Sequence, residues 1–152
     1  MQKIFITMSL DKSLGYMLGR SLKVFKNHMN IELKSKNIDL SLEQFIILNM
    51  LDSHCDFIQQ DLAKQLQKDK SLIVRQVDGL LKNRYIVRVE NENDKRKKTL
   101  ILTKSGFEKL NEVRVIGDEI TVKLLSGLTE DELNVFRHVL TKIWENGGLN
   151  EE

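Results

Sequence analysis

Two stretches of the chain gather side chains that suit contact with a polyanion. The first lies near the start of one helical pattern, where a polar and basic face consists of Lys70, Ser71, Arg75 and Gln76, opposite the apolar Ile73, Val74 and Val77. Arginine suits guanine or phosphate, glutamine suits adenine, and serine suits either kind of contact. Taken alone, such a face is also typical of a solvated helix. With the elements described below, it favours a helix that reads base edges in a major groove.

The second stretch is a run of cations between two short apolar segments. It consists of Lys95, Arg96, Lys97 and Lys98, preceded by Asp94. Like charges crowded at one tip do not help folding, whereas a narrow minor groove concentrates negative potential and attracts arginine. We expect Arg96 to reach a minor groove, at a base edge or at the backbone. Asp94 either orients that guanidinium by a charge-assisted hydrogen bond or only forms the turn.

The charge distribution supports a polyanionic partner. The whole chain carries a net charge of only +2, but residues 64–104 contain 12 Lys and Arg against five Asp and Glu. The segment after residue 104 contains five against ten. Positive charge concentrated in the middle of the chain predicts that a polyanionic partner binds there.

These side chains need elements that hold them outward. The segments "IQQDLAKQLQ" and "DKSLIVRQVDGLLKN" both have helical apolar spacing, with Asp69 as a good N-cap for the second. Only the few residues around Gln67 and Lys68 separate them, so we expect a steep crossing, the helix-turn-helix. The apolar period then changes to two in "YIVRVE" and "KTLILT", which predicts an antiparallel hairpin with "NENDKRK" at its tip. A hairpin directly after a helix-turn-helix is a wing.

Helical patterns flank this middle region on both sides. A long helix is predicted from Ser9 to Lys36, and a second begins at "SLEQ", where Ser41 and Gln44 form a capping box, and stops near Ser53. Thr103 or Ser105 can open the next helix, and Glu108 is placed to complete a capping box with Ser105. The last helix begins with a capping box in "TEDE", 129–132, and ends at Gly147 and Gly148. The middle lobe is too small to cover the apolar stripes of these outer helices, which predicts a homodimer.

The predicted fold class is therefore mainly α with a small β-hairpin wing, a winged helix-turn-helix flanked by N- and C-terminal dimerisation helices. We expect a single chain, 1–152, in which residues 40–104 form the DNA-binding lobe. Residues 9–36 and 105–146 form the helical dimerisation region.

Other classes of protein find little support. His28, His54 and His138 are far apart and form no ligand pair of the H-x-x-x-H kind, so we expect no metal, no cofactor and no enzyme. No run approaches the roughly 20 apolar residues of a membrane span, and the N-terminus lacks the pattern of a secretory signal. A cytoplasmic protein is expected. Cys55 cannot form an internal disulfide, and the neighbouring Asp52 and Asp56 oppose a reactive thiolate.

The sequence resembles the MarR family of bacterial winged-helix transcription regulators, whose pattern runs D-K-S-x-x-x-R-x-V-D-x-L, then a strand, then D-x-R and L-T-x-x-G. The matching positions of the recognition helix are Asp69, Lys70, Ser71, Arg75, Val77, Asp78 and Leu80. Those of the wing and the following helix start are Asp94, Arg96, Leu102, Thr103 and Gly106. The resemblance implies an obligate homodimer that binds a pseudo-palindromic operator, usually to repress, with relief by a small molecule or an oxidant. It matches Arg75 and Arg96 to the family's recognition-helix and wing-tip arginines.

Two departures from the family pattern affect what carries over. Many relatives have a glycine between the recognition helix and the first strand, whereas this chain has "KNRYI", so Asn83 or Arg84 must take that turn. Redox-sensing relatives keep their reactive cysteine in the first helix, whereas Cys55 lies after the second. A small-molecule effector is expected to bind between the dimerisation helices and the lobe, in a pocket lined by Phe25, Met29, Phe45 and Leu48, although such a stripe is more often core.

Two alternatives stay open at this point. A winged-helix protein that has lost DNA binding would act as a protein-interaction adaptor, and the basic residues at both groove-facing positions argue against this. A regulator that senses oxidants through Cys55 is the other alternative. DNA affinity that depends on salt would exclude the adaptor, because phosphate contacts release counterions.

Overall fold

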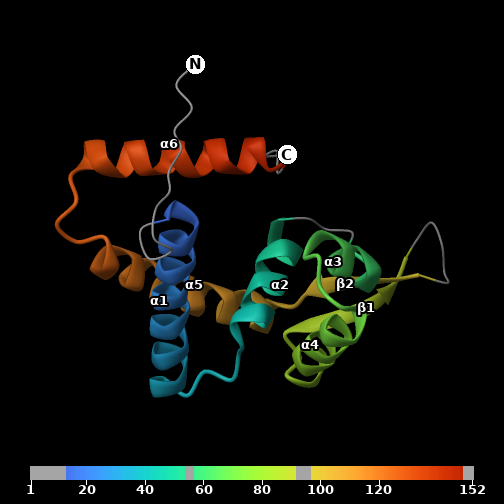
Figure 1. Cartoon of the computed structure of the whole chain (residues 1–152). Coiled ribbons are helices and arrows are strands. Elements are labelled where there is room, and N and C mark those ends of the chain that lie inside the picture. The colour runs from blue at the N-terminus through green and yellow to red at the C-terminus, as the bar shows by residue number, and fades with distance from the viewer. Residues whose placement is uncertain (1–12, 54–56, 92–96, 149–152) are drawn as a thin grey trace. The chain divides into compact units, whose positions relative to one another are not determined.

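The computed structural model describes residues 13–53, 57–91 and 97–148. The elements within these ranges are α1 (Leu14–Ser35), α2 (Leu42–Ser53), α3 (Gln59–Gln65), α4 (Lys70–Lys82), β1 (Ile86–Glu90), β2 (Lys98–Leu102), α5 (Lys104–Leu124) and α6 (Glu130–Asn146) (Figure 1). The two strands form an antiparallel hairpin, so the predicted fold class is confirmed. Contacts group the chain into two compact units, residues 1–120 and 121–152, and α5 runs from the first into the second.

Helix starts follow the capping residues of the sequence, with one correction. At α2, the Gln44 amide donates to the Ser41 hydroxyl oxygen over 3.2 Å, and the Ser41 amide donates to Gln44 Oε1 over 2.9 Å. At α5 the cap is Thr103, whose hydroxyl accepts from the Gly106 amide over 3.0 Å. The capping box between Ser105 and Glu108 was therefore a wrong prediction, because Ser105 already lies inside the helix.

The last helix keeps its predicted ends, whereas the first begins later than predicted. Ser13 is extended and caps α1 through its hydroxyl, which accepts from the Tyr16 amide, so the prediction that the helix already includes position 13 was wrong; residues 9–12 lie outside the described residues. The box of "TEDE" forms at α6, where the Thr129 amide donates to Glu132 Oε2 over 2.8 Å. Gly147 caps the other end, and Gly148 follows with a φ of 80°. Among the described helices, none is long and apolar enough to cross a membrane.

The helix-turn-helix of α3 and α4 is held by its turn and by its N-cap. Gln67 has a φ of 48°, and the Lys68 amide donates back to the Ala63 carbonyl over 3.2 Å. The carboxylate of Asp69 accepts from the Ser71 amide over 2.7 Å, which confirms Asp69 as the N-cap of α4. The two helices therefore change direction within a few residues, as predicted.

The core of the first unit lies where α2, α3, α4, the hairpin and α5 meet. Its fully buried side chains are Ile47, Leu48, Leu62, Val77, Leu80, Ile86, Leu100, Leu110 and Val113. From α4, the buried residues Ile73, Val77 and Leu80 recur at helical spacing. Val74 was predicted to point inward with them, but it is 39% exposed because it lies at the edge of this narrow apolar arc.

Arg84 makes the turn that leads from α4 into the hairpin. Its φ is 59°, in the left-handed region that favours glycine, so Arg84 rather than Asn83 takes the strained position. The Tyr85 amide then donates to the Leu80 carbonyl over 3.0 Å. In the hairpin that follows, Ile86 pairs with Leu102 and Arg88 pairs with Leu100.

Gly106 allows the start of α5 to lie against the entry to β1. The carbonyl oxygen of Tyr85 accepts from the Thr103 amide over 3.0 Å and from the Thr103 hydroxyl over 3.1 Å. A Cβ at position 106 would lie only 2.0 Å from the same oxygen. The glycine therefore has a steric reason, and it fixes the root of the wing to α5.

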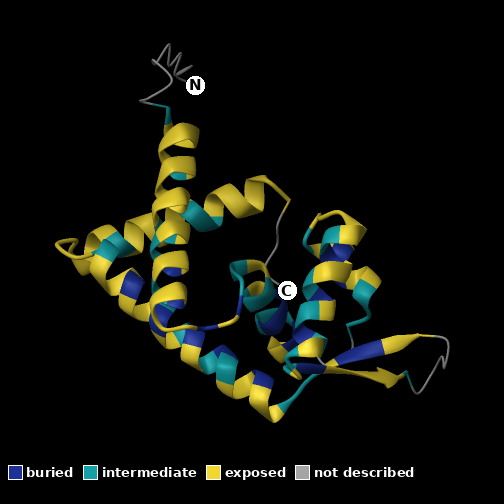
Figure 2. Cartoon of the chain, turned by 90° about the horizontal axis from the view of Figure 1, so that it is seen from below, coloured by how far each residue is buried: buried dark blue, intermediate teal, exposed yellow. Residues whose placement is uncertain are grey.

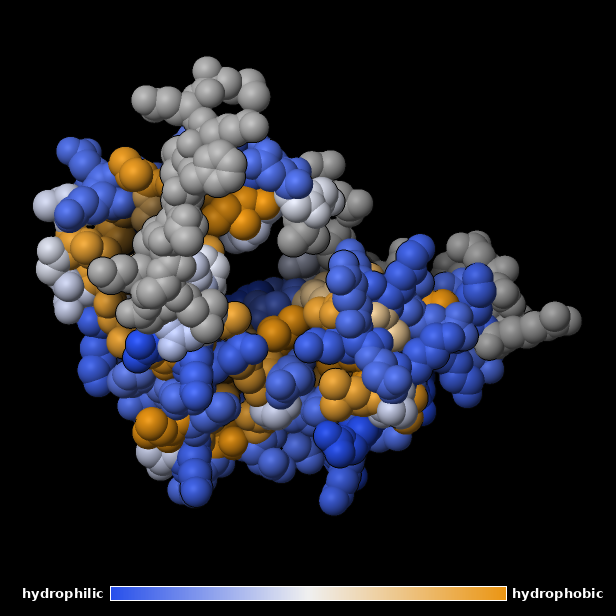
Figure 3. All heavy atoms as spheres, in the orientation of Figure 1, coloured by the Kyte–Doolittle hydropathy of each residue, from blue (hydrophilic) through white to orange (hydrophobic). Residues whose placement is uncertain are grey.

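The terminal helices α1 and α6 are less buried than the winged helix-turn-helix. In α1, Leu14 is 70% exposed and Leu22 is 55% exposed, and Figure 2 shows most of that helix in the colour for exposed residues. No described residue of α6 is buried, and hydrophobic atoms lie open on its surface in Figure 3. Its exposed apolar residues, here called the α6 stripe, are Val135, Phe136, Val139, Ile143 and Trp144.

Candidate nucleic-acid interface

The outer face of α4 presents most of the side chains that the sequence selected. Lys70, Ser71 and Arg75 are exposed. The Ser71 hydroxyl donates to the carboxylate of Asp69, and this bond, followed by the one from the Ser71 amide, lowers the pKa of Asp69. Asp69 therefore stays an anion that orders the first turn of α4. The face thus exposes two cations, Lys70 and Arg75, to a polyanion. Between them lies Ser71, whose side chain is held by Asp69.

Gln76 is placed differently from its neighbours on that face. Its side chain is half-buried, and its Oε1 accepts from the Ser41 hydroxyl over 3.3 Å. Its backbone carbonyl accepts from Nε2 of Gln44 over 3.3 Å, so the N-terminus of α2 docks on α4 at this point. A bidentate contact with adenine uses both the oxygen and the nitrogen of the amide. Such a contact by Gln76 would require its oxygen to leave Ser41.

The wing is described at its base and not at its tip. Asp94, Lys95 and Arg96 lie outside the described residues. Lys97 and Lys98 are exposed, and Lys98 pairs across the hairpin with Glu90. These two lysines place positive charge on the same unit as the outer face of α4.

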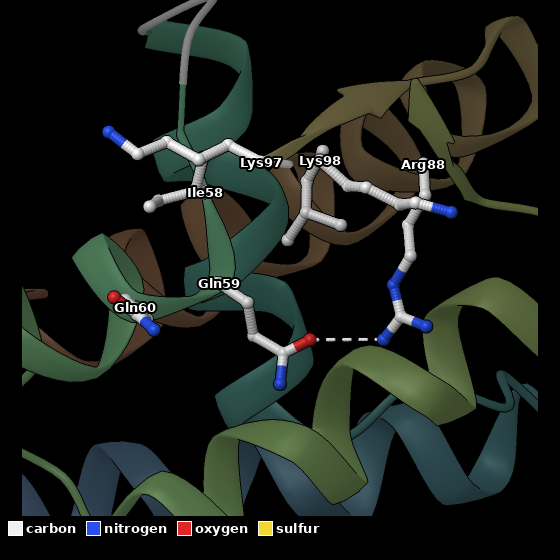
Figure 4. A pocket seen from close by; sticks show the side chains of 7 residues that line it. Ile58, Gln59, Gln60, Arg88, Lys97 and Lys98 are labelled. Carbon is white, nitrogen blue, oxygen red and sulfur yellow. Dashed lines mark hydrogen bonds between the residues drawn. The ribbon is translucent and has the colours of Figure 1, made fainter. Parts of the chain in front are cut away.

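Arg88 links the wing to the helix-turn-helix, and the sequence analysis missed it. Its Nη2 donates to Gln59 Oε1 over 3.0 Å (Figure 4). The same Nη2 donates to Asp78 Oδ1 over 3.1 Å. The guanidinium of Arg88 on β1 thus links α3 to α4. The Arg88 side chain is 38% exposed, and the Asp78 side chain is 57% exposed. The sequence pattern that could have identified Arg88 is the period-two alternation of the strand, because it puts Arg88 on the same face as the buried Ile86.

A hollow of about 520 Å³ lies between α3 and the base of the wing. It is lined by Ile58, Gln59, Gln60, Arg88, Lys97, Lys98 and Leu100 (Figure 4). Three of these side chains are cations, and two are amides that can donate hydrogen bonds. The hollow is therefore suited to an anionic group such as a phosphate of a nucleic-acid backbone.

The residues predicted for an effector pocket occupy the helical core of the first unit. Met29 and Leu48 are buried, and Phe25 and Phe45 are half-buried. The effector pocket stays a prediction. His54 and Cys55 lie outside the described residues. Among the residues that the structure describes, no group of three His, Cys, Asp or Glu side chains could hold a metal ion.

Comparison with known proteins agrees with this geometry. The model of the MarR family matches residues 40–98. The HTH-type transcriptional regulator BilQ of Clostridium symbiosum is 31% identical over 112 residues, which cover 74% of this chain and 76% of BilQ. The HTH-type transcriptional repressor MdtR of Bacillus subtilis is 28% identical over 109 residues, which cover 72% of this chain and 70% of MdtR.

A solved structure extends the likeness to the whole fold. The MepR–DNA complex of S. aureus superimposes with a TM-score of 0.74 at 26% identity, over 91% of this chain and 99% of MepR. The winged helix-turn-helix, its basic face and these relatives agree on one assignment. The chain belongs to the MarR family, and it is a DNA-binding transcription regulator with a winged-helix fold.

Proposed function

We propose that the protein is a ligand-responsive repressor that acts as a homodimer on a pseudo-palindromic operator. The observation that carries the proposal is the exposed face of α4 with Lys70 and Arg75, next to a wing that Arg88 ties to the same helix. The names of two relatives support it, because MdtR is described as a repressor and the MepR structure is a complex with DNA. This role needs no catalytic step, and it places the protein in the cytoplasm with the chromosome.

In this proposal the two halves of the interface have different tasks. The face of α4 with Lys70, Ser71, Arg75 and Gln76 enters the major groove and reads bases. The wing residues from Asp94 to Lys98 follow the flanking minor groove, with Arg96 as the side chain that enters it. The basic hollow beside Arg88 takes a backbone phosphate and so fixes the register of the lobe.

The dimer is supported by the apolar surface that the terminal helices leave open. The α6 stripe is one such apolar surface, and the exposed Leu22 of α1 belongs to another; each is of the kind that a second copy covers. A two-fold dimer would present two recognition helices about 34 Å apart, one helical turn of DNA, to the two halves of a palindrome.

Ligand control requires that an effector bind one separation of the two recognition helices better than another. The pocket proposed for it is lined by Phe25, Met29, Phe45 and Leu48. Phe25 and Met29 belong to α1, in the predicted dimerisation region, and Phe45 and Leu48 belong to α2, in the lobe. An apolar small molecule suits such a lining.

Site selection from random duplex fragments tests DNA recognition directly. We expect an enriched palindrome whose half-sites are about one helical turn apart. Arg75→Ala should lower the affinity about tenfold and relax the choice of base at one position of each half-site. Arg137→Ala, on the exposed surface of α6, is the matched control and should bind as the wild type does. The absence of any enriched palindrome would contradict the proposal.

Sedimentation at a series of concentrations tests the dimer. Phe136→Ser combined with Ile143→Ser should shift the protein from dimer to monomer, because both changes remove apolar area from the α6 stripe. A double variant on the opposite, charged side of the same helix, such as Glu130→Ser with Glu145→Ser, should leave the dimer intact. Equal dissociation of the two double variants would argue against the α6 stripe as the dimer surface.

A further inference from the structure

Arg114 on α5 has a side chain that reaches across to α2. Its Nε and Nη2 donate to Asn49 Oδ1 over 3.0 and 2.9 Å, and Nη2 also donates to Asp52 Oδ2 over 2.8 Å. Nη1 donates to Asn111 Oδ1, one turn earlier on α5, over 3.3 Å. Every nitrogen of the guanidinium therefore has an acceptor, and two of the three acceptor side chains belong to α2.

This cluster joins two parts of the first unit that have different tasks. Helix α2 carries the recognition helix, because Ser41 and Gln44 at its start are bonded to Gln76 of α4. Helix α5 starts beside the wing at Gly106, packs Leu110 and Val113 into the core, and continues beyond Ile120 into the second unit. Arg114 lies about 12 Å along α5 from Gly106 at 1.5 Å per residue. Arg114 therefore contacts α2 at a place distant from the start of the hairpin, which lies against Gly106.

The pairing is suited to fixing an angle. The side chains are 35% exposed for Arg114 and 25% for Asp52, so solvent screens this ion pair only in part. A guanidinium bonds in one plane and in fixed directions, unlike the flexible ammonium of lysine. Two of its nitrogens share the single oxygen of Asn49 while one of them also bonds Asp52. A rotation of α2 about α5 would break at least one of these bonds.

From this geometry we infer that Arg114 is a positioning residue that sets the angle between the DNA-binding lobe and α5. In a dimer built through the outer helices, that angle determines which spacing of the two half-sites the protein accepts. This consequence rests on the proposed function. Arg114 itself touches no DNA, so it contributes to the choice of spacing and not to the reading of bases.

The first arm of the test needs no DNA. Spin labels at Lys82 on α4 and Glu119 on α5, both exposed, are introduced in a Cys55→Ser background, and the distribution of their distance is measured. Arg114→Met should broaden the distribution, since the bonds to Asn49 and Asp52 are lost. Lys109→Met is the matched control, because it removes an ion pair that lies entirely within α5. An equally narrow distribution in Arg114→Met would overturn the inference.

The second arm measures the choice of spacing. Affinities are compared for the selected operator and for versions in which the half-sites are moved apart or together by one base pair. We expect Arg114→Met to reduce the preference for the selected spacing about fivefold, the lower end of typical coupling between sites. The dependence of binding on salt should stay as in the wild type. A salt slope lowered by about one would mean that Arg114 is a phosphate contact, and the inference would fail.

Arg114→Lys separates geometry from charge. It keeps the charge but loses the planar fork, so it should relax the spacing preference as Arg114→Met does. If Arg114→Lys kept the spacing preference of the wild type, the positive charge alone would be sufficient to hold α2 against α5. Wild-type protein that bound no palindromic duplex would contradict the proposed function, while the label distances would still decide whether Arg114 fixes the angle.

Discussion

The winged lobe and the terminal helices bury their apolar residues to different extents. In the lobe, side chains such as Leu62, Leu80 and Leu100 are fully buried within one chain. In α6, no described residue is buried, although the helix carries an apolar stripe of similar spacing. The lobe therefore buries its apolar side chains within one chain, whereas the terminal helices expose apolar side chains of the kind that a further contact would bury.

The difference does not come from local helix signals. Ser41 caps α2 in the lobe, and Thr129 caps α6 with the same reciprocal pair of bonds. Both regions thus form well-ended helices from local residues. Burial is decided at a higher level, by which surfaces meet, and in the terminal helices we propose that the meeting surface belongs to a second copy.

Of the substitutions that test this difference in burial, one at a buried leucine should have the largest effect on the free energy of unfolding. Leu62→Ala should lower the free energy of unfolding by about 3 kcal/mol, because it leaves a cavity where the side chain was 0% exposed. Leu22→Ala on α1 should cost under about 0.5 kcal/mol in a single chain. Denaturant unfolding at several protein concentrations measures both. A larger loss for Leu22→Ala that shrinks on dilution would show that a second copy covers it.

Substitution of two glycines, one in each region, should have the second largest effect on stability. Gly106→Ala should destabilise the protein by about 2 kcal/mol, because the new Cβ would collide with the Tyr85 carbonyl. Gly19→Ala in α1 meets no atom within 4 Å and should stabilise that helix by up to about 1 kcal/mol. Thermal unfolding of the two variants distinguishes them by sign. A destabilising Gly19→Ala would indicate that another chain packs closely on that glycine.

A pair of serine caps should give a smaller effect. Ser41→Ala should cost about 1 kcal/mol, since it removes the cap of α2 together with the bond to Gln76. Ser13→Ala should cost about 0.5 kcal/mol, because the bond that its hydroxyl accepts from the Tyr16 amide is long, at 3.3 Å, and exposed. Amide hydrogen exchange in the first turns of α2 and α1 would report each loss. Equal losses would show that the contact with Gln76 adds nothing.

The smallest effect should appear in acid. The pKa of Glu132 is lowered by the bond from the Thr129 amide and then by that from its hydroxyl, and the pKa of Asp69 is lowered by Ser71. Because both folded pKa values lie below the unfolded ones, the stability these groups contribute is complete above the unfolded pKa. It is lost below about pH 4, as the pH falls through the folded pKa.

Thr129→Ala should raise the pKa of Glu132 and leave that of Asp69 unchanged, whereas Ser71→Ala should do the reverse. Nuclear magnetic resonance titration of the two carboxyl carbons measures both shifts. If either variant moved both pKa values, the two caps would not be independent local features of the two regions.

The elements of the fold could be predicted from the sequence where the signal is local. Asp69, Ser41 and Thr129 each cap a helix through residues two or three positions away, so their neighbours suffice to identify them. Between Thr103 and Ser105 the sequence offered two caps, and the choice depends on the Tyr85 carbonyl, which is distant in the chain. Val74 was misplaced because periodicity gives a face but not the width of the surface that packs on it.

The site could be predicted in part. Lys70, Ser71 and Arg75 lie on the outer face of α4 as expected, because one helix alone decides their direction. Arg88 was missed, since its partners Gln59 and Asp78 come from two other elements. The orientation of Gln76 depends on Ser41, 35 residues earlier. Contacts between elements therefore decided the features that periodicity could not show.

The close approach at Gly106 has a mechanical consequence. Because the Tyr85 carbonyl is bonded twice to Thr103 and lies against Gly106, the hairpin is clamped to the first turn of α5. Ile120 lies about 20 Å further along the same helix at 1.5 Å per residue. If the helix pivots as a rigid rod at this clamp, a displacement of about 2 Å at Ile120 corresponds to a rotation of only about 6°. The hairpin would turn through the same angle, so α5 would then transmit a small displacement at Ile120 to the wing.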